Sequence, residues 1–411
     1  MYFIAKRIYR AGEAGRVSAS AVRIATAGVA VGIMVMIISI CVTVGFQREI
    51  KQRVAALVGH IQIINSQSLY RTYSVPIQIT DSLKQQVLDI SSVQQVRRFS
   101  LCPGMIKTDT DFRGVFFRGV EHGNIPSFIS DNLDSGTIPS FTANKASSDS
   151  IMLSTSLARS LQIQAGDKVY AYFFDEGLRA RRFVVAGTFC TNMADFDAKM
   201  CYADIHTVQK LTRWENDQYS GAEVMLHDFT DLESASASIS QVLRMRKDAY
   251  EQYYASPRVH EMFPQIFSWL TLLDNNVVAI LILMICVAGV TMISGLLIII
   301  LERTRFIGVM KAMGATNRQL QRTFLYLAAM IVLRGLFYGN ILALALLFLQ
   351  KQTQILQLDS ASYYLSHVPV YFQWPELVSI NVITLVVCVL ILIVPSYLVC
   401  RIQPARSIKF E

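Results

Sequence analysis

Four long segments of the chain contain almost no charged residue, and they constrain the fold more than any other feature of the sequence. Ile24–Gln47, Asn275–Leu301 and Leu377–Cys400 contain no charged residue, and Thr323–Gln350 contains only Arg334. About 20 apolar residues in a helix are enough to cross the hydrocarbon core of a bilayer. The sequence therefore predicts a membrane protein with four transmembrane α-helices, and it excludes a soluble protein. The predicted spans are residues 24–46, 277–301, 323–349 and 377–400.

The distribution of charge predicts the orientation of the spans. The chain has a net charge of +8, and the excess of Lys and Arg lies in three short segments, 1–23, 302–322 and 401–411. Short loops that are rich in Lys and Arg stay on the cytoplasmic side of the membrane. Both termini are therefore predicted to be cytoplasmic, with residues 47–276 on the other side. The positive charge sets the topology and does not indicate a nucleic-acid partner.

The segments between the spans have distinct predicted roles. Residues 47–276 alternate strand and helix patterns, so they are expected to form a large α+β extracytoplasmic domain inserted between helices 1 and 2. A loop-like stretch that ends near Ser150 predicts two lobes, the second over about 151–230. The helix of the first span is expected to continue through Gln47–Leu57, and a helix from Val259 is expected to lead into the second span. The remaining predicted segments are a cytoplasmic amphipathic N-terminal segment on the lipid surface (1–23), a cytoplasmic loop (302–322), an outer loop (350–376) and a cytoplasmic C-terminus (401–411).

The sequence contains no recognisable motif for nucleotide binding, catalysis or metal binding. There is no G-x-x-x-x-G-K-[ST] phosphate-binding loop and no Cys/His cluster with the spacing of metal ligands. We therefore expect no enzyme, no catalytic residue, no metal site and no cofactor bound by this chain. Cys190 and Cys201 are spaced either for a disulfide across a hairpin or for two buried thiols.

The loop after the second span has clear helix signals. Ile307, Met310 and Met313 are spaced for one side of a helix, and Gly314 suits a left-handed helix end. Thr316 and Gln319 fit a capping box that starts the next helix. Two interpretations remain open: a rigid helical hairpin that binds a partner, or a basic loop that only sets topology.

Two features within the spans predict helix contacts. Arg334 lies near the middle of the third span, where a charge is costly and usually faces a polar cavity or a partner. Its role is therefore either functional or in assembly, or it pairs with a neighbouring span. Gly28 and Gly32 form a G-x-x-x-G pattern, which allows close helix approach. The pattern either marks a contact between two copies or reflects only that glycine is common in spans.

Several segments resemble a known family. The loop sequence ERTRFIGVMKAMGAT (302–316) closely resembles the signature of FtsX/MacB-like ABC-transporter permeases. Three further segments resemble the lipoprotein-releasing permeases of the LolC/LolE type: GFQREIKQRVAALVGHIQI (45–63), IMLSTSLARSLQIQAGDKVYAYF (151–173) and PSYLVCRIQPARSIKFE (395–411).

This resemblance implies a location, partners and an activity. The chain would lie in the bacterial inner membrane with its large domain in the periplasm, paired with a second permease that is identical or a paralogue. A separate ABC-type ATPase that uses ATP and Mg would bind on the cytoplasmic side. The complex would extract lipoproteins from the inner membrane for a periplasmic carrier. Two alternatives are FtsX-like mechanotransmission to a cell-wall hydrolase and MacB-like efflux.

The resemblance also assigns roles to residues. The helix that couples to the ATPase would contain Glu302, Arg305, Gly308, Lys311, Gly314, Ala315 and Thr316. The candidate carrier-docking loop is Asp175, Glu176, Gly177, Leu178 and Arg179, for which a plain hairpin turn is the alternative. Candidates to face the lipid anchor are Val42, Phe46, Val54, Phe263, Phe267 and Leu270, and ordinary packing is the alternative for each.

Overall fold

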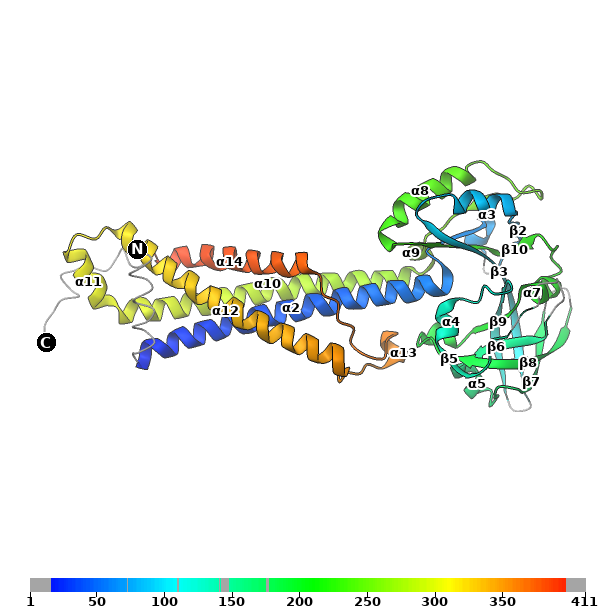
Figure 1. The fold of residues 1–411 in the computed structure, drawn as a ribbon, viewed down its shortest axis with the longest axis horizontal. Coiled ribbons are helices and arrows are strands. Elements are labelled where there is room, and N and C mark those ends of the chain that lie inside the picture. Colours follow the sequence, from blue (N-terminus) through cyan, green and yellow to red (C-terminus); the bar gives the residue numbers. More distant parts are fainter. Residues whose placement is uncertain are drawn as a thin grey trace. The chain divides into compact units, whose positions relative to one another are not determined.

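The described residues form two compact units, one from the spans and one mainly from the segment between the first two spans. The computed structural model describes residues 16–71, 73–108, 111–139, 141, 148–174 and 177–396. The membrane unit comprises the described residues of Met1–Gln47, Trp269–Leu356 and His367–Glu411, and the large domain comprises those of Arg48–Ser268 and Gln357–Ser366. Figure 1 shows the chain coloured along its sequence. The large domain thus includes part of the loop predicted over 350–376.

In the part of the chain that the structure describes, four helices are long and apolar enough to cross a membrane. They are α2 (Arg16–Val58), α10 (Pro264–Glu302), α12 (Asn317–Thr353) and α14 (Trp374–Ser396). A short helix, α11 (Thr304–Ala312), lies between α10 and α12. Each of the four predicted spans falls on one of the long helices, and residues 397–400 lie outside the described residues. The predicted segments 1–23 and 401–411 lie wholly or largely outside them as well.

Two helices extend beyond their predicted spans. The predicted continuation of the first span over Gln47–Leu57 is confirmed, because α2 ends at Val58. It stops at Gly59, whose φ of +82° is a conformation that favours glycine and whose N–H donates to the Ala55 carbonyl. The helix predicted from Val259 into the second span is present as two helices, a short α9 (Val259–Met262) and then α10, which begins at Pro264. Proline suits the first turn of a helix, where its missing N–H costs nothing.

Glycines allow the four helices to pack closely. A Cβ at Gly28 would lie 2.5 Å from Thr291 Cγ2 on α10, and a Cβ at Gly32 would lie 3.6 Å from Ala288 Cβ. The G-x-x-x-G pattern of α2 therefore faces α10 of the same chain, and the predicted contact between two copies stays a prediction. On α12, Gly335 and Gly339 form a second such pattern, which faces α2. This second pattern was not predicted, because glycine is common in spans and its spacing alone does not mark a contact.

Gly339→Ala is expected to destabilise the membrane unit by about 1–3 kcal/mol, the usual cost of overpacking a close contact. The added Cβ would overlap Ile33 Cγ2 and would lie 2.6 Å from the backbone oxygen of Ala30. The matched control is Gly32→Ala, whose Cβ would make ordinary contacts. Thermal unfolding of the purified chain in detergent measures both. Equal melting temperatures for the two variants would contradict this packing.

Among the described residues of the large domain, ten strands form one sheet and two more form a small second sheet. The strands are β1 (Ile61–Asn65), β2 (Ile77–Gln78), β3 (Val93–Lys107), β4 (Phe112–Val120), β5 (Leu133–Gly136), β6 (Ser150–Ser154), β7 (Lys168–Phe173), β8 (Arg179–Phe189), β9 (Met200–Asp204), β10 (Gln218–Tyr219), β11 (Gly221–Leu226) and β12 (Tyr254–Ala255). The helices are α3 (Asp81–Leu88), α4 (Ser127–Asp131), α5 (Thr155–Ser160), α6 (Ala194–Asp197), α7 (Ile205–Thr212), α8 (Leu232–Leu243), α9 (Val259–Met262) and α13 (Ser360–Tyr363), with 3₁₀ turns η1 (Ser66–Leu69) and η2 (Phe229–Asp231). The domain is α+β, as predicted.

The order of the strands divides the domain differently from the prediction. Of the described strands, β3, β4, β9, β6, β8 and β7 pair in a closed ring, which makes a small barrel. Inside this barrel the Phe117 ring lies 5.0 Å from Phe173 and 5.5 Å from Phe183. The other lobe consists of β12, β1, β11 and the first half of β3, with α3 and α8 (Figure 1). The lobes therefore do not follow the predicted range of 151–230, because the long strand β3 contributes to both.

Cys190 and Cys201, for which the sequence allowed either a disulfide or two buried thiols, are free thiols. Cys190 is half-buried and Cys201 is fully buried in β9. Burial raises the pKa of the Cys201 thiol well above its usual value. The structure thus favours the buried-thiol interpretation over the disulfide.

Candidate functional site

The segment between α10 and α12 is a capped helical hairpin. Arg303, with φ of −98° and ψ of 16°, separates α10 from α11. At the end of α11, the N–H of Ala315 donates to the Met310 carbonyl (2.9 Å) and the N–H of Gly314 donates to the Lys311 carbonyl (3.0 Å). These two bonds make a Schellman motif, in which Gly314 takes the left-handed conformation with φ of +93°. The hairpin therefore has a defined turn.

The start of α12 has the capping box that the sequence predicted. The Thr316 hydroxyl accepts a hydrogen bond from the Gln319 N–H, and the Gln319 side chain accepts one from the Thr316 N–H. These bonds satisfy two N–H groups that the helix itself leaves open. With the end of α11 and the start of α12 both capped, α11 is held in one orientation relative to the first turns of α12.

One face of α11 packs on the spans and the other is exposed. Ile307 and Gly308 are buried in the membrane unit, and Met310 packs against the same cluster. Met313 is 78% exposed, so the prediction that it shares a side with Ile307 is wrong. The turn at Met313 and Gly314 points its side chain away from the spans. The exposed face therefore carries apolar as well as basic side chains.

The seven predicted coupling residues divide between these two faces. Gly308 is buried, whereas Lys311 and Ala315 are half-buried. The exposed members are Glu302, Arg305, Gly314 and Thr316. Val309, which the sequence analysis did not select, is exposed beside them. Its exposure depends on which face of α11 packs against the spans, and only the structure shows this.

Arg334 lies on the exposed face at the middle of α12. Its neighbour Gly335 is buried against Val29 of α2, so the arginine side chain starts from the side of α12 that faces away from α2. A second polar feature of the spans was missed by sequence analysis. Asn340 of α12 and Asn381 of α14 exchange hydrogen bonds of 2.7 and 3.1 Å through their amides. Such pairs stabilise helix contacts in lipid, where water offers no alternative partner.

The predicted lipid-facing residues have different environments. Val54 and Leu270 are each only 2% exposed, so both pack inside the chain and neither faces lipid in this structure. Phe267 stacks on Phe229 within the large domain. The remaining three, Val42, Phe46 and Phe263, are half-buried.

The predicted carrier-docking loop joins β7 and β8. Asp175 and Glu176 lie outside the described residues. Gly177 has φ of +129°, and Leu178 is 66% exposed. Arg179 begins β8, where its side chain donates to the Leu211 carbonyl (3.2 Å). Carrier docking by this loop stays a prediction.

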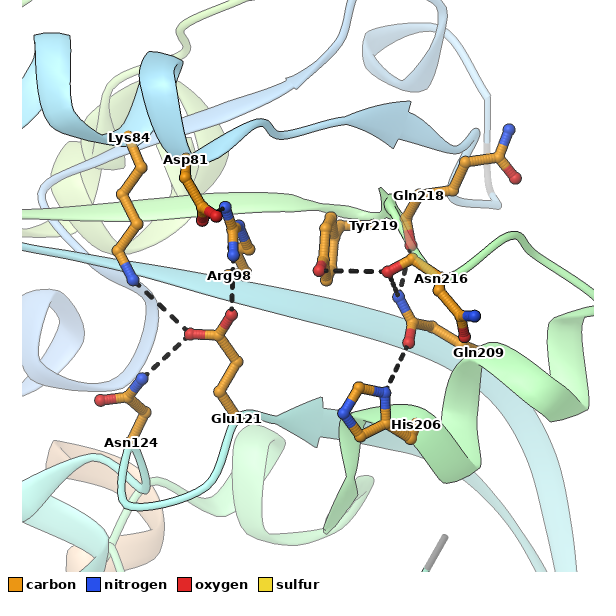
Figure 2. Close-up of polar contacts among 10 residues, drawn as sticks. All are labelled: Asp81, Lys84, Arg98, Glu121, Asn124, His206, Gln209, Asn216, Gln218 and Tyr219. Carbon is orange, nitrogen blue, oxygen red and sulfur yellow. Dashed lines mark hydrogen bonds and ion pairs between the residues drawn. The ribbon is translucent and has the colours of Figure 1, made fainter. Parts of the chain in front are cut away.

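A polar network that the sequence did not predict links elements of the two lobes (Figure 2). Arg98 of β3 pairs with Asp81 at the start of α3 and with Glu121 after β4. Glu121 also lies 3.7 Å from the Lys84 ammonium. The hydrogen bond from Arg98 lowers the pKa of the Asp81 carboxyl. These residues are far apart in sequence, so only the fold brings them together.

The second half of this network involves α7. The Gln209 side chain donates to the carbonyls of Gln218 (2.8 Å) and Asn216 (3.3 Å), and its oxygen lies 3.2 Å from His206 Nδ1. Tyr219 completes the link, because its hydroxyl donates to Asn216 and its ring lies 5.2 Å from the Arg98 guanidinium. The contacts hold α7, β10 and β3 together (Figure 2).

A buried ion cluster lies where β11, β3 and β4 adjoin. Glu223 contacts both Arg118 and Arg97, the latter at 3.1 Å, and all three side chains are almost fully buried. Burial lowers the pKa of Arg118 to about 10. Gly59, just after α2, lies against this cluster, because a Cβ there would come within 3.0 Å of Glu223 Cβ. Within the described residues, no group of three or more His, Cys, Asp or Glu side chains is arranged to hold a metal ion.

Comparisons with known proteins match the two parts of the chain to two family models. Residues 24–242 match the family model of the MacB-like periplasmic core domain, and residues 277–404 match that of the FtsX-like permease C-terminal. The chain is 22% identical over 407 residues to the lipoprotein-releasing system transmembrane protein LolC of Xylella fastidiosa, covering 93% of this chain and 92% of the relative. It is 19% identical over 432 residues to LolE of Haemophilus influenzae, covering 99% of each. The solved periplasmic region of MacB from Actinobacillus actinomycetemcomitans aligns with 52% of this chain and 95% of its own length, at 12% identity and a TM-score of 0.34.

Proposed function

The chain belongs to the FtsX/MacB-like family of ABC-transporter permeases, and we propose that it is the permease subunit of an ATP-driven transporter that releases lipoproteins from the inner membrane. Relatives along nearly the whole chain, LolC and LolE, have the name of a lipoprotein-releasing system. A triacylated lipoprotein is held in lipid at ~0.8 kcal/mol for each buried CH₂ group, so its extraction needs an input of energy. The periplasmic carrier would receive the extracted protein.

The observation that carries this proposal is the capped hairpin around α11. A loop that only set topology would need basic charge but no defined turn. Here Gly314 and Thr316 hold the turn, while Val309 and Met313 expose apolar surface beside Arg305. An apolar centre with basic charge at its edge is a surface that suits a protein partner. We assign this surface to the ATPase, whose ATP and Mg supply the energy.

Movement at this surface has a direct route through the chain. Ile307 is buried in the membrane unit, so a displacement of α11 must also displace the spans against which it packs. Both α2 and α10 then continue as unbroken helices from the spans into segments of the large domain. The proposed cycle uses ATPase closure to move α11 and, through it, these two helices. The lipid anchor, held between the first and second spans of the two protomers, would then be expelled outward.

The proposed assembly follows from the same route. Two permeases, identical or paralogous, bind an ATPase dimer at the inner membrane, with both termini of this chain cytoplasmic. Mechanotransmission to a cell-wall hydrolase and efflux are the alternatives, and the names of the full-length relatives favour neither. Membrane lipids surround the exposed faces of the spans.

Depletion of the protein is expected to trap outer-membrane lipoproteins in the inner membrane. The measurement is quantitative immunoblotting of separated inner and outer membranes at successive times after depletion. The control is re-expression of the wild-type chain, which restores the distribution. Normal lipoprotein levels in the outer membrane after complete depletion would overturn the proposal, and altered cell-wall hydrolysis in the same cells would favour mechanotransmission.

A further inference from the structure

One aromatic ring in the large domain contacts both helices that lead to the first two spans. Phe229, in the short turn η2, lies 5.7 Å from the Lys51 ammonium of α2 and 6.4 Å from the Phe267 ring of α10, to which it is nearly parallel (20°). His60 of the segment after α2 lies 5.6 Å from the same ring. His260 of α9 contacts Phe267 edge-on at 6.1 Å. These contacts all lie within the large domain.

The chain holds Phe229 in place by local bonds. The Asp228 carboxylate accepts a hydrogen bond from the Thr230 N–H (2.9 Å), which forms the turn that presents the phenylalanine. His60 is fixed by the Leu226 N–H, which donates to its Nδ1 (3.2 Å). Burial lowers the pKa of His60 to about 4, so its ring is neutral at pH 7. Phe229 therefore has a preset position beside a neutral ring.

We propose that Phe229 is a clasp between α2 and α10 of one chain, and that its release controls how far these helices separate when a lipid anchor leaves the space between the first and second spans of the two protomers. The release of a lipid anchor in this inference rests on the proposed function. The contact of Phe229 with both helices does not. Lys51 and Phe267 are more than 200 positions apart in sequence, and η2 is the element that contacts both side chains.

The kinds of contact suit a clasp that opens in every cycle. A cation over a half-buried ring and an offset aromatic stack are weak interactions that form and break without a large barrier. Phe229 and Phe267 are half-buried, and Lys51 is too, so none of them is locked in a core. By contrast, Ile50 and Val54 on the neighbouring turns of α2 are fully buried and keep this part of α2 attached to the domain. The clasp can thus open while the domain stays folded.

Distance measurements test the clasp without any lipoprotein. Spin labels at Gln52→Cys and Gln265→Cys, two exposed positions on α2 and α10, report on the separation of these helices in the full transporter complex. Cys190, Cys286 and Cys400 are replaced by alanine in this background. Phe229→Ala is expected to lengthen the mean distance and broaden its distribution, whereas Phe229→Tyr keeps the wild-type distribution. The matched control is Phe112→Ala, an exposed phenylalanine on β4 outside this cluster.

A release assay then tests the consequence. The complex is reconstituted in liposomes with a triacylated lipoprotein, and ATP-independent loss of bound lipoprotein is followed over time. Phe229→Ala is expected to raise this rate about tenfold, the effect of losing one or two weak contacts. Unchanged label distances, or a release rate equal to that of Phe112→Ala, would overturn the clasp. If the wild-type complex releases no lipoprotein with ATP and carrier, the proposed function fails, and the label distances still decide the clasp.

Discussion

Replacing Gly314 by valine is expected to abolish ATP-driven lipoprotein release while the protein remains folded in the membrane. Gly314 ends α11 with φ of +93°, a conformation that a β-branched residue avoids. A Cβ at this position would meet nothing within 4 Å, so the effect comes from the backbone alone. Strain of this kind costs about 1–3 kcal/mol, which the turn can relieve only by changing shape. The exposed face that carries Val309 and Met313 would then be presented differently to the ATPase.

The matched control for this variant is Gly123→Val in the large domain. Gly123 also has a positive φ, of +71°, and a Cβ there also meets nothing within 4 Å. Both variants should therefore lose similar stability, but only Gly314→Val should lose stimulation of the ATPase. Because 1.4 kcal/mol changes an equilibrium tenfold, we expect ATPase docking to weaken by about tenfold or more. Wild-type ATPase stimulation in Gly314→Val would show that α11 is not the coupling element.

Glu223→Leu is expected to destabilise the large domain by about 3–5 kcal/mol, the usual effect of removing one partner of a buried ion pair. Glu223 is the carboxylate that both Arg97 and Arg118 contact, and without it two guanidinium groups are left in the domain interior. Tyr202 lies nearby, but burial raises the pKa of its hydroxyl, so it does not supply a negative charge at pH 7. For a domain of this size, each kcal/mol lowers the melting temperature by roughly 2–4 °C.

Thermal unfolding of the full chain in detergent, followed by circular dichroism, measures this loss. The matched control is Asp149→Ala, which removes an ion pair of 2.7 Å with Arg181 on the surface of the same domain. An exposed pair of this kind is worth about 0–1 kcal/mol. A melting temperature of Glu223→Leu equal to that of the control would contradict the assignment of a buried charge cluster at this site.

The parts of the structure that sequence analysis predicted correctly depend on local patterns. The four spans follow from uncharged windows, and the α11 turn follows from Gly314 with the Thr316 and Gln319 box, because capping acts within a few residues. The continuation of the first helix through Gln47–Leu57 followed from the local helical pattern, and α2 ends at Val58. The structure was needed where the answer depends on distant segments. For Val54, both contact with the lipid anchor and ordinary packing were open, and the residue is buried. Met313 was expected to share a side with Ile307 but is exposed.

The strand β3 shows why the lobes were misplaced. Its first half pairs with β11 and its second half with β4 and β7, so one continuous strand serves both lobes. A pattern of alternating apolar and polar residues predicts a strand, but it does not predict which strands pair with it. The same limit applies to the ion cluster, since Arg97, Arg118 and Glu223 come from three strands.

By itself, the sequence determined that this chain crosses the membrane four times, that its second and third spans are joined by a capped helical hairpin, and which family signature that hairpin resembles. These properties depend on hydrophobicity and capping, which act over one or two helical turns or one span. Only the tertiary structure decided that Gly28 and Gly32 face α10 of the same chain, that β3 joins the two lobes, and that Phe229 contacts both α2 and α10. Those contacts join residues far apart in sequence, and a local sequence pattern does not predict which distant side chain packs against a given residue.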